Sequence, residues 1–524
     1  MKKKFSIALF TLYFLLVSGV GIYVCLTSAV WKMLVLHLAH GFTLAWIFTF
    51  LNDFLPKKSL RIILNSLLIA ILSVSFLTDI FCVMEFNSTF TEDFIALILG
   101  SDPAESSEFI ELHYKGFLVG ILVWGVLLGS FLLLRKYTVS IPVAAYLASG
   151  LLLIPCLILI NINPGARRNL LRYNAAEGKI YMMVDYMRTA PPDFRDFIQP
   201  ADLAFVAPQP ENIVIVFGES HCRSHCPFFG YDKMTMPECQ RLIDEGHMAA
   251  FGNVSAPDIN TSKAFKSLMS TYIPEYEDSI LFYTCQTLPQ VIRDAGYHST
   301  WISNQSKRGF YDNIIGNFAD LCDTTLFNGD KFSGMLRKNL DGELIPLVDS
   351  LARADSSRHR NVYFIHLMGS HPGFHDRYPA DFQYFQESDY PDRPEKQRYH
   401  YATYDNSLRY TDAVLSGIIR AFQDKEAIVL YLSDHALDFY VTKDNYCAHA
   451  ITRDTESGRV SMEVPFLIYT SDLFRQRFPS MCERIERSTD HEYRTDSLIY
   501  TVMDIAGVVF KDPEEPVRGS IILQ

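Results

Sequence analysis

The chain has 524 residues, of which 49% are apolar and 20% are charged, and its formal net charge is −12. This length predicts at least two domains, and the apolar content excludes disordered, collagen-like and low-complexity proteins. Residues 1–161 carry ten Lys and Arg against nine Asp and Glu, whereas residues 162–524 carry 37 against 50. The acidic second part argues against nucleic-acid binding, which needs a basic surface.

The first block is predicted to be a multi-pass α-helical membrane domain, because five stretches approach the ~20 apolar residues that cross a bilayer. The five spans are expected at residues 5–31, 33–51, 62–84, 116–134 and 137–166. The Lys-rich start and the first stretch also fit a signal peptide. Four further spans favour a signal-anchor helix instead, and the transmembrane domain is therefore assigned to residues 1–161.

Basic residues predict the orientation of these spans. They gather at the start of the chain, between the second and third spans, and between the fourth and fifth spans. This pattern predicts a cytoplasmic N-terminus, and an odd number of spans then places the C-terminal domain outside. The segment 85–115 also lies outside and is expected to be an interfacial helical loop. Its apolar side is formed by Phe90, Phe94, Ile95, Leu97 and Ile98.

Residues 162–205 form the predicted linker, which contains an amphipathic helix. Two placements of this helix remain open: packing on the soluble domain, or lying on the outer leaflet of the membrane. Seven cysteines follow residue 161. In an oxidising compartment some of them should pair, and the odd count leaves at least one free. The chain has no CxxC pair, which argues against a zinc site built from thiolates.

From residue 206 to residue 524 the pattern alternates between strands and helices. Short β-branched or aromatic runs predict strands at residues 212–217, 299–303, 361–367, 427–432 and 464–469. Helices are expected at residues 407–424 and 495–506, and residues 373–397 read as an excursion over the surface. This alternation predicts an α/β domain with a mostly parallel central sheet that is covered on both faces.

Polar side chains follow three of the predicted strands directly. Glu219 follows the first strand, His371 the third, and Asp434 and His435 the fourth. Because ligands bind at the carboxyl ends of strands in open α/β sheets, these side chains are expected to converge. Carboxylate and imidazole groups together are ligands for zinc or manganese.

A nucleophile for such a site is offered by Thr261, which begins a predicted helix after a loop. A metal lowers the pKa of an oxygen nucleophile, and a helix N-terminus suits a phosphate group. The alternative is structural, since a Thr or Asn before a helix is commonly an N-cap. The spacing alone leaves both interpretations open.

Several sequence motifs, in their order along the chain, resemble those of the phosphoethanolamine transferases, a branch of the alkaline phosphatase and sulfatase superfamily. They are VIVFGESHCRSHCPFFGY, residues 253–271, FIHLMGSHPGFHDRYP, YDNSLRYTD, LYLSDHA and EVPFLIYTS. The resemblance covers five spans, a linker and an extracytoplasmic sulfatase-like catalytic domain. It implies a bacterial inner-membrane protein with a periplasmic catalytic domain, which we expect to be a monomer.

The resemblance also implies roles for individual residues. Glu219, Thr261, Asp434 and His435 would bind the catalytic zinc, with Thr261 as the nucleophile. His371 and His449 would bind the substrate phosphate or a second metal, so one or two Zn²⁺ are expected, with Mn²⁺ as the alternative. The chain departs from the family at Ala436, where the family has Gly after Asp-His. Because Gly adopts positive φ and Ala resists it, the turn there is expected to differ.

The implied reaction transfers phosphoethanolamine from phosphatidylethanolamine to a lipopolysaccharide acceptor, lipid A or a core sugar, through a phosphoethanolamine-threonine intermediate. Each added group places an ammonium beside an anionic phosphate, so cationic peptides should bind less well.

Three other functions are alternatives to this transferase. A phosphoglycerol transferase of the lipoteichoic acid synthase type fits the GSH, YDNSLRYTD and SDH strings less well. A sulfatase needs a Cys or Ser followed by Pro or Ala and then Arg, for conversion to formylglycine. Thr261 and the residues after it do not form this motif. The third alternative is a non-catalytic membrane protein. The intact Glu219, Thr261, Asp434 and His435 argue against it, and binding of no zinc or manganese would favour it.

Overall fold

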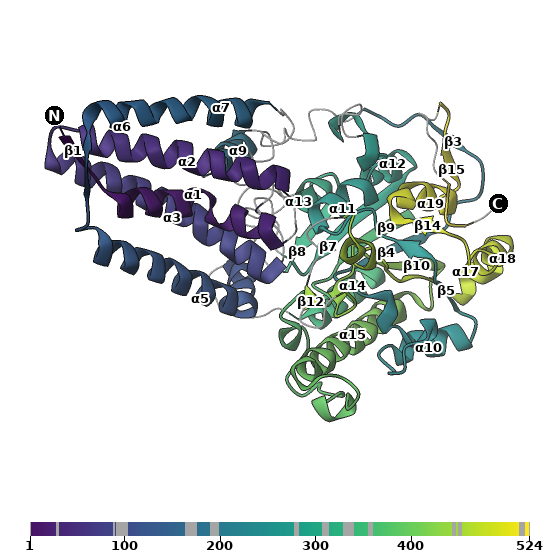
Figure 1. The fold of residues 1–524 in the computed structure, drawn as a ribbon. Coiled ribbons are helices and arrows are strands. Elements are labelled where there is room, and N and C mark those ends of the chain that lie inside the picture. Colours follow the sequence, from purple (N-terminus) through teal and green to yellow (C-terminus); the bar gives the residue numbers. More distant parts are fainter. Residues whose placement is uncertain are drawn as a thin grey trace. The chain divides into compact units, whose positions relative to one another are not determined.

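A computed structural model gives the fold of the chain (Figure 1). It describes residues 2–27, 31–86, 90, 103–162, 176–188, 199–276, 282–305, 314–328, 340–354, 360–442, 447–448, 453–512 and 519–522. The chain divides into two compact units, Met1–Ala190 and Pro191–Gln524.

The first unit contains five helical segments that are long and apolar enough to cross a membrane, as the sequence predicted. They are α1 (Ile7–Thr27), α2 (Trp31–Phe54), α3 (Lys58–Phe86), α5 (Pro103–Leu134), and a last segment made of α6 (Val143–Ser149), a 3₁₀ turn and α7 (Leu153–Asn161). Segments that are apolar all round are typical of membrane-spanning helices. A short strand, β1 (Lys2–Phe5), pairs antiparallel with β2 (Val139–Pro142).

The fourth span differs from the prediction at its start. The sequence predicted an interfacial helical loop up to residue 115 and a separate span from residue 116, whereas α5 begins at Pro103 and continues without a break into the apolar stretch. The helix therefore extends for about three and a half turns before the apolar stretch. Of the five apolar residues expected in that loop, Phe90 is described and buried, and the other four lie outside the described residues.

The linker helix, α9 (Ala176–Arg188), packs on α3 within the first unit. The Lys179 ammonium lies 2.7 Å from Asp79 Oδ2 and 2.9 Å from Ser75 Oγ, and the Lys179 side chain is only 8% exposed. This contact does not test the two placements expected for the amphipathic helix, on the soluble domain or on the outer leaflet. A buried ion pair with a membrane helix holds α9, because burial of either charge alone would be costly.

The second unit is built on a seven-stranded sheet with the order β5-β13-β10-β4-β9-β7-β8. The strands are β4 (Asn212–Gly218), β5 (Met248–Phe251), β7 (Tyr297–Ser303), β8 (Thr324–Phe327), β9 (Arg360–His366), β10 (Ala427–Ser433) and β13 (Phe466–Thr470). β10, β4, β9, β7 and β8 are parallel, and β13 is antiparallel to both β10 and β5. The mostly parallel sheet is confirmed, while β5 and β8 were not predicted.

Helices cover both faces of this sheet (Figure 1). One face packs against α10 (Pro237–Asp244), α14 (Ile345–Ala354) and the C-terminal half of α15 (Glu395–Phe422). The other face packs against α11 (Thr261–Leu268), α12 (Leu288–Asp294), α13 (Ile314–Ala319) and α19 (Leu498–Ile505). The central strand β4 is buried along its whole length, as a parallel strand between two helical layers must be.

Helix α15 begins at Glu395, twelve residues before the predicted start. Its first turns carry buried polar side chains, among them Tyr404, Asp405 and Asn406, so they lack the apolar periodicity that marks a core helix. The predicted surface excursion therefore ends at residue 394, three residues earlier than expected, where this helix begins.

The disulfides expected for an oxidising compartment are not found among the described cysteine side chains. Two of them have other partners. Cys222 Sγ accepts a hydrogen bond from the Leu437 amide at 3.3 Å, and Cys226 Sγ lies 3.3 Å from His221 Nε2. Burial raises the pKa of both thiols, so neither is activated as a thiolate.

Candidate metal centre

Two neighbouring parallel strands bring the site together. β4 ends at Gly218 and β10 at Ser433, and these two residues are paired in register. Glu219 therefore leaves the sheet beside Asp434 and His435, and all three side chains are buried. The convergence expected at the strand ends is present, and one ligand atom from each of the three residues lies within 4.8 Å of the others.

The imidazole of His435 is oriented by its own backbone. Its Nδ1 lies 3.1 Å from the Ala436 carbonyl, which can only accept, so Nδ1 carries the hydrogen. The Nε2 atom then faces two carboxylates, 3.3 Å from Glu219 Oε1 and 3.4 Å from Asp434 Oδ2. In the neutral ring this places a nitrogen lone pair among carboxylate oxygens, which is an arrangement suited to a cation.

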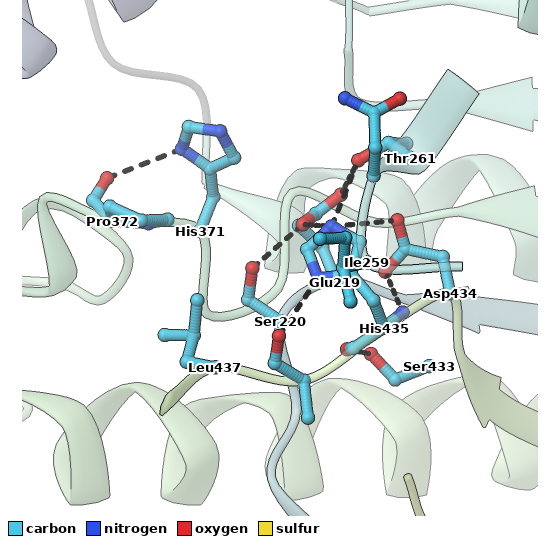
Figure 2. Close-up of polar contacts among 12 residues, drawn as sticks. Glu219, Ser220, Ile259, Thr261, His371, Pro372, Ser433, Asp434, His435 and Leu437 are labelled. Atoms are coloured by element: carbon cyan, nitrogen blue, oxygen red, sulfur yellow. Dashed lines mark hydrogen bonds and ion pairs between the residues drawn. The ribbon is translucent and has the colours of Figure 1, made fainter. Parts of the chain in front are cut away.

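Thr261 completes the cluster from the first turn of α11 (Figure 2). The N-cap of this helix is Asn260, whose side chain accepts from the Lys263 amide at 3.2 Å. The Thr261 hydroxyl is not used as a cap. It lies 3.1 Å from His435 Nε2 and 3.3 Å from Glu219 Oε2.

The two carboxyl groups are held in an environment that disfavours their charge. Burial, with the nearby Asp434 charge, raises the pKa of Glu219 to about 8, and burial raises the pKa of Asp434 to about 7. Ser220 Oγ donates to Glu219 Oε1 at 2.8 Å, and the His435 amide donates to Asp434 Oδ1 at 2.8 Å. Asp434 Oδ2 is buried without a hydrogen-bond donor among the described residues. Two acidic oxygens and an imidazole nitrogen that face one another fit a divalent metal.

His371 lies on the loop after β9, but its ring stands apart from the cluster (Figure 2). Its Nδ1 lies 3.3 Å from the Pro372 carbonyl, and Arg377 Nη2 lies 3.5 Å from the same nitrogen. Burial and the Arg377 charge lower the pKa of His371 to about 3. His449, the other predicted histidine, lies outside the described residues. The two residues before it, Cys447–Ala448, form β12, which pairs with β11 (Asp438–Phe439).

Sequence reasoning missed the residues that hold the loop carrying His371. Asp341 is buried and accepts hydrogen bonds from the Met368 and Gly369 amides, each at 2.8 Å. Gly369 has a φ of +52°, and a Cβ there would lie 2.7 Å from the Glu219 nitrogen. The only sequence signal was the Gly of the GSH string, while Asp341 lies outside every recognised string.

The turn after His435 accommodates Ala436 without the positive φ that the family's Gly permits. Ala436 is buried, and its amide donates to the Ser461 carbonyl at 2.7 Å. Instead, the left-handed backbone occurs at Ser220, which has a φ of +55°. Departures of this kind in non-glycine residues cluster at functional sites.

A family model described as Sulfatase matches residues 211–508. Phosphoethanolamine transferase EptC of Escherichia coli O18:K1:H7 is 25% identical over 328 residues, which cover 60% of this chain and 53% of that protein. The chain thus spans about half the length of that relative in the alignment.

Two solved structures share the fold. The integral membrane protein lipooligosaccharide phosphoethanolamine transferase A (EptA) from Neisseria meningitidis superposes with a TM-score of 0.67 at 20% identity, covering 96% of both chains. The C-terminal periplasmic domain of EcEptC from Escherichia coli, solved in complex with Zn, gives 0.55 at 23% identity, covering 62% of this chain and 90% of that one. The chain belongs to the sulfatase family, and it shares its fold with a full-length phosphoethanolamine transferase.

Proposed function

We propose that this protein is a metal-dependent phosphoethanolamine transferase. It takes phosphoethanolamine from phosphatidylethanolamine and transfers it to a lipopolysaccharide acceptor, lipid A or a core sugar. One observation carries the proposal: the Thr261 hydroxyl lies 3.1 Å from His435 Nε2 and 3.3 Å from Glu219 Oε2, although Asn260 already caps the helix. The transferase names of EptC and EptA, which share the family or the fold, support the same reaction class.

Glu219, Asp434, His435 and Thr261 would hold one metal ion. We propose Zn²⁺, the ion in the solved EcEptC domain, with Mn²⁺ as the alternative. Such an ion supplies positive charge that stabilises a deprotonated hydroxyl and the phosphoryl oxygens. His371 would bind the substrate phosphate or a second metal, and it would act as a neutral imidazole because its pKa is about 3. His449 is also proposed to bind the substrate phosphate or a second metal.

Thr261 carries the covalent chemistry in two steps. In the first, Thr261 Oγ1 loses its proton and forms a bond to phosphorus, while the bond from phosphorus to the diacylglycerol oxygen breaks and that oxygen takes up a proton. In the second, an acceptor hydroxyl loses its proton and forms the new bond, and Thr261 Oγ1 leaves and is reprotonated. Each step exchanges one P–O bond for another, so no oxidant or reductant is needed.

The proposed setting is a bacterial inner membrane, with a cytoplasmic N-terminus and the catalytic unit in the periplasm. The basic residues at the start of the chain and in two loops support this orientation. A lipid donor explains why the enzyme has a membrane domain, because the phosphate of the lipid lies at the membrane surface. The product carries an added ammonium beside an anionic phosphate, so resistance to cationic peptides is the expected physiological outcome.

The test is the intact mass of the purified full chain after incubation with phosphatidylethanolamine vesicles. The wild type and the control variant Thr489→Ala, which is remote in sequence from the cluster, should gain one phosphoethanolamine, and Thr261→Ala should gain none. An adduct from phosphatidylglycerol instead would assign the chain to the phosphoglycerol transferases. An adduct that persists in Thr261→Ala would refute the proposed nucleophile.

A further inference from the structure

The YDNSLRYTD string lies on α15, and the proposed reaction does not use it. Its first four residues, Tyr404 to Ser407, are all buried. We propose that Tyr404 and Ser407 are positioning residues that hold the backbone of Glu219 and thereby set the orientation of a metal ligand. This inference rests on the proposed function, because it concerns the same metal centre.

Tyr404 holds the chain immediately after Glu219. Its hydroxyl donates to the Ser220 carbonyl at 2.8 Å and accepts from the Cys222 amide at 2.8 Å. A single hydroxyl can do both, since it has one hydrogen and free lone pairs. These bonds hold the chain on both sides of His221, directly after the left-handed Ser220, whose conformation is unfavourable for a non-glycine residue. The Tyr404 hydroxyl therefore stabilises the turn that directs Glu219 into the cluster.

Ser407 holds Glu219 from the other side, through the loop after β9. Ser407 Oγ lies 2.7 Å from the Tyr404 carbonyl and 2.9 Å from Ser370 Oγ. Because the carbonyl can only accept, Ser407 donates to it, and Ser370 Oγ donates to Ser407. The Ser370 amide in turn donates to the Glu219 carbonyl at 2.9 Å. Residues three apart share a helix face, so one face of α15 is linked both to the Glu219 carbonyl, through Ser370, and to the chain that follows Glu219.

The Tyr404 ring has a separate packing role. Its centroid lies 4.9 Å from that of Phe374, on the loop that follows His371, and 4.5 Å from that of Phe439, on the loop that follows His435. Tyr404→Phe keeps this ring and removes only the hydroxyl, so it separates positioning of Glu219 from packing of the three loops.

The experiment compares Zn²⁺ affinity, measured by competition with a chromophoric chelator, for the full chain in detergent. Tyr404→Phe and Ser407→Ala are the test variants. Tyr399→Phe, at an exposed tyrosine of the same helix, is the matched control. We expect about a tenfold loss of affinity in Tyr404→Phe, a smaller loss in Ser407→Ala and no change in the control. For adduct formation, kcat should fall while KM for the lipid stays constant.

Wild-type affinity in Tyr404→Phe, with normal adduct formation, would overturn the positioning role and leave the proposed function intact. The positioning role would also be overturned if Tyr404→Phe lost affinity only in proportion to a lowered thermal midpoint and Tyr399→Phe showed the same effect. A wild type that binds Zn²⁺ but forms no adduct refutes the transferase and not the positioning. A wild type that binds no metal refutes both.

Discussion

Metal binding to the cluster should be strongly pH-dependent, because protons and the metal compete for the same oxygens. Burial raises the pKa of Glu219 to about 8 and that of Asp434 to about 7, so in the metal-free protein both carboxyls are favoured in their protonated forms at pH 6. A metal needs both groups deprotonated. Lowering the pH from 8 to 6 therefore weakens binding, and raising it strengthens binding.

The size of the loss in metal affinity follows from these pKa values. Between pH 8 and pH 6, protonation of Glu219 alone weakens binding by about 50-fold, and independent protonation of Asp434 extends the loss to about 500-fold. The two carboxyls face each other through His435 Nε2 and share their protons, so the observed loss should fall between these limits. Between one and two protons should then be released for each metal bound at pH 6.

Calorimetric titration of the full chain with Zn²⁺, in two buffers that differ in ionisation enthalpy, counts the released protons. Asp434→Asn should bind Zn²⁺ more weakly at pH 8 and show a shallower pH dependence, whereas Glu486→Gln, an exposed carboxyl on α18 (Pro479–Arg487), should behave as wild type. Tight binding with no proton release at pH 6 would show that the carboxyls are already ionised, and the reasoning from burial would be wrong.

Three further substitutions test the surrounding structure. Gly369→Ala should weaken Zn²⁺ binding at least tenfold, because its Cβ would lie 2.7 Å from the Glu219 nitrogen; wild-type affinity in a chelator competition would contradict this. Asp341→Asn should destabilise the second unit by about 1–3 kcal/mol, since an amide nitrogen would face a buried donor; an unchanged chemical-unfolding midpoint would argue against it. Lys179→Met should lower the free energy of unfolding of the first unit by about 3–5 kcal/mol, because it leaves the Asp79 carboxyl buried without its partner. Adding Asp79→Leu should restore the thermal midpoint. Equal midpoints for the wild type and Lys179→Met would refute the role of the ion pair.

The main features of the fold were predictable because they depend on runs of similar residues. Five apolar stretches gave five helices, and β-branched runs such as residues 427–432 gave the central strands. Elements without such a run were missed. The four-residue strand β8 has no fully buried position, and the first turns of α15 bury polar groups such as Asp405, whose partners are distant in sequence.

The site was predictable where residues follow a strand directly and not where a distant partner sets the geometry. Glu219, Asp434 and His435 could be placed together because parallel strands end at one edge. The choice between a capping and a catalytic position for Thr261 needed the structure, because only coordinates show that Asn260 provides the cap. Asp341 could not be found at all, since nothing in its local sequence indicates that it binds the loop after β9.

The ion pair between α9 and α3 has a consequence for the order of synthesis. Asp79 and Lys179 are separated by 100 residues, so the carboxyl of α3 is made well before its partner. At about 5–20 residues per second, α3 waits on the order of 5–20 s for α9. During that interval two more apolar segments emerge, and the acidic side chain must be accommodated by water or headgroups. The membrane unit is therefore complete only when α9 has been translated, and a chain cut before residue 176 would leave it with an unpaired buried acid.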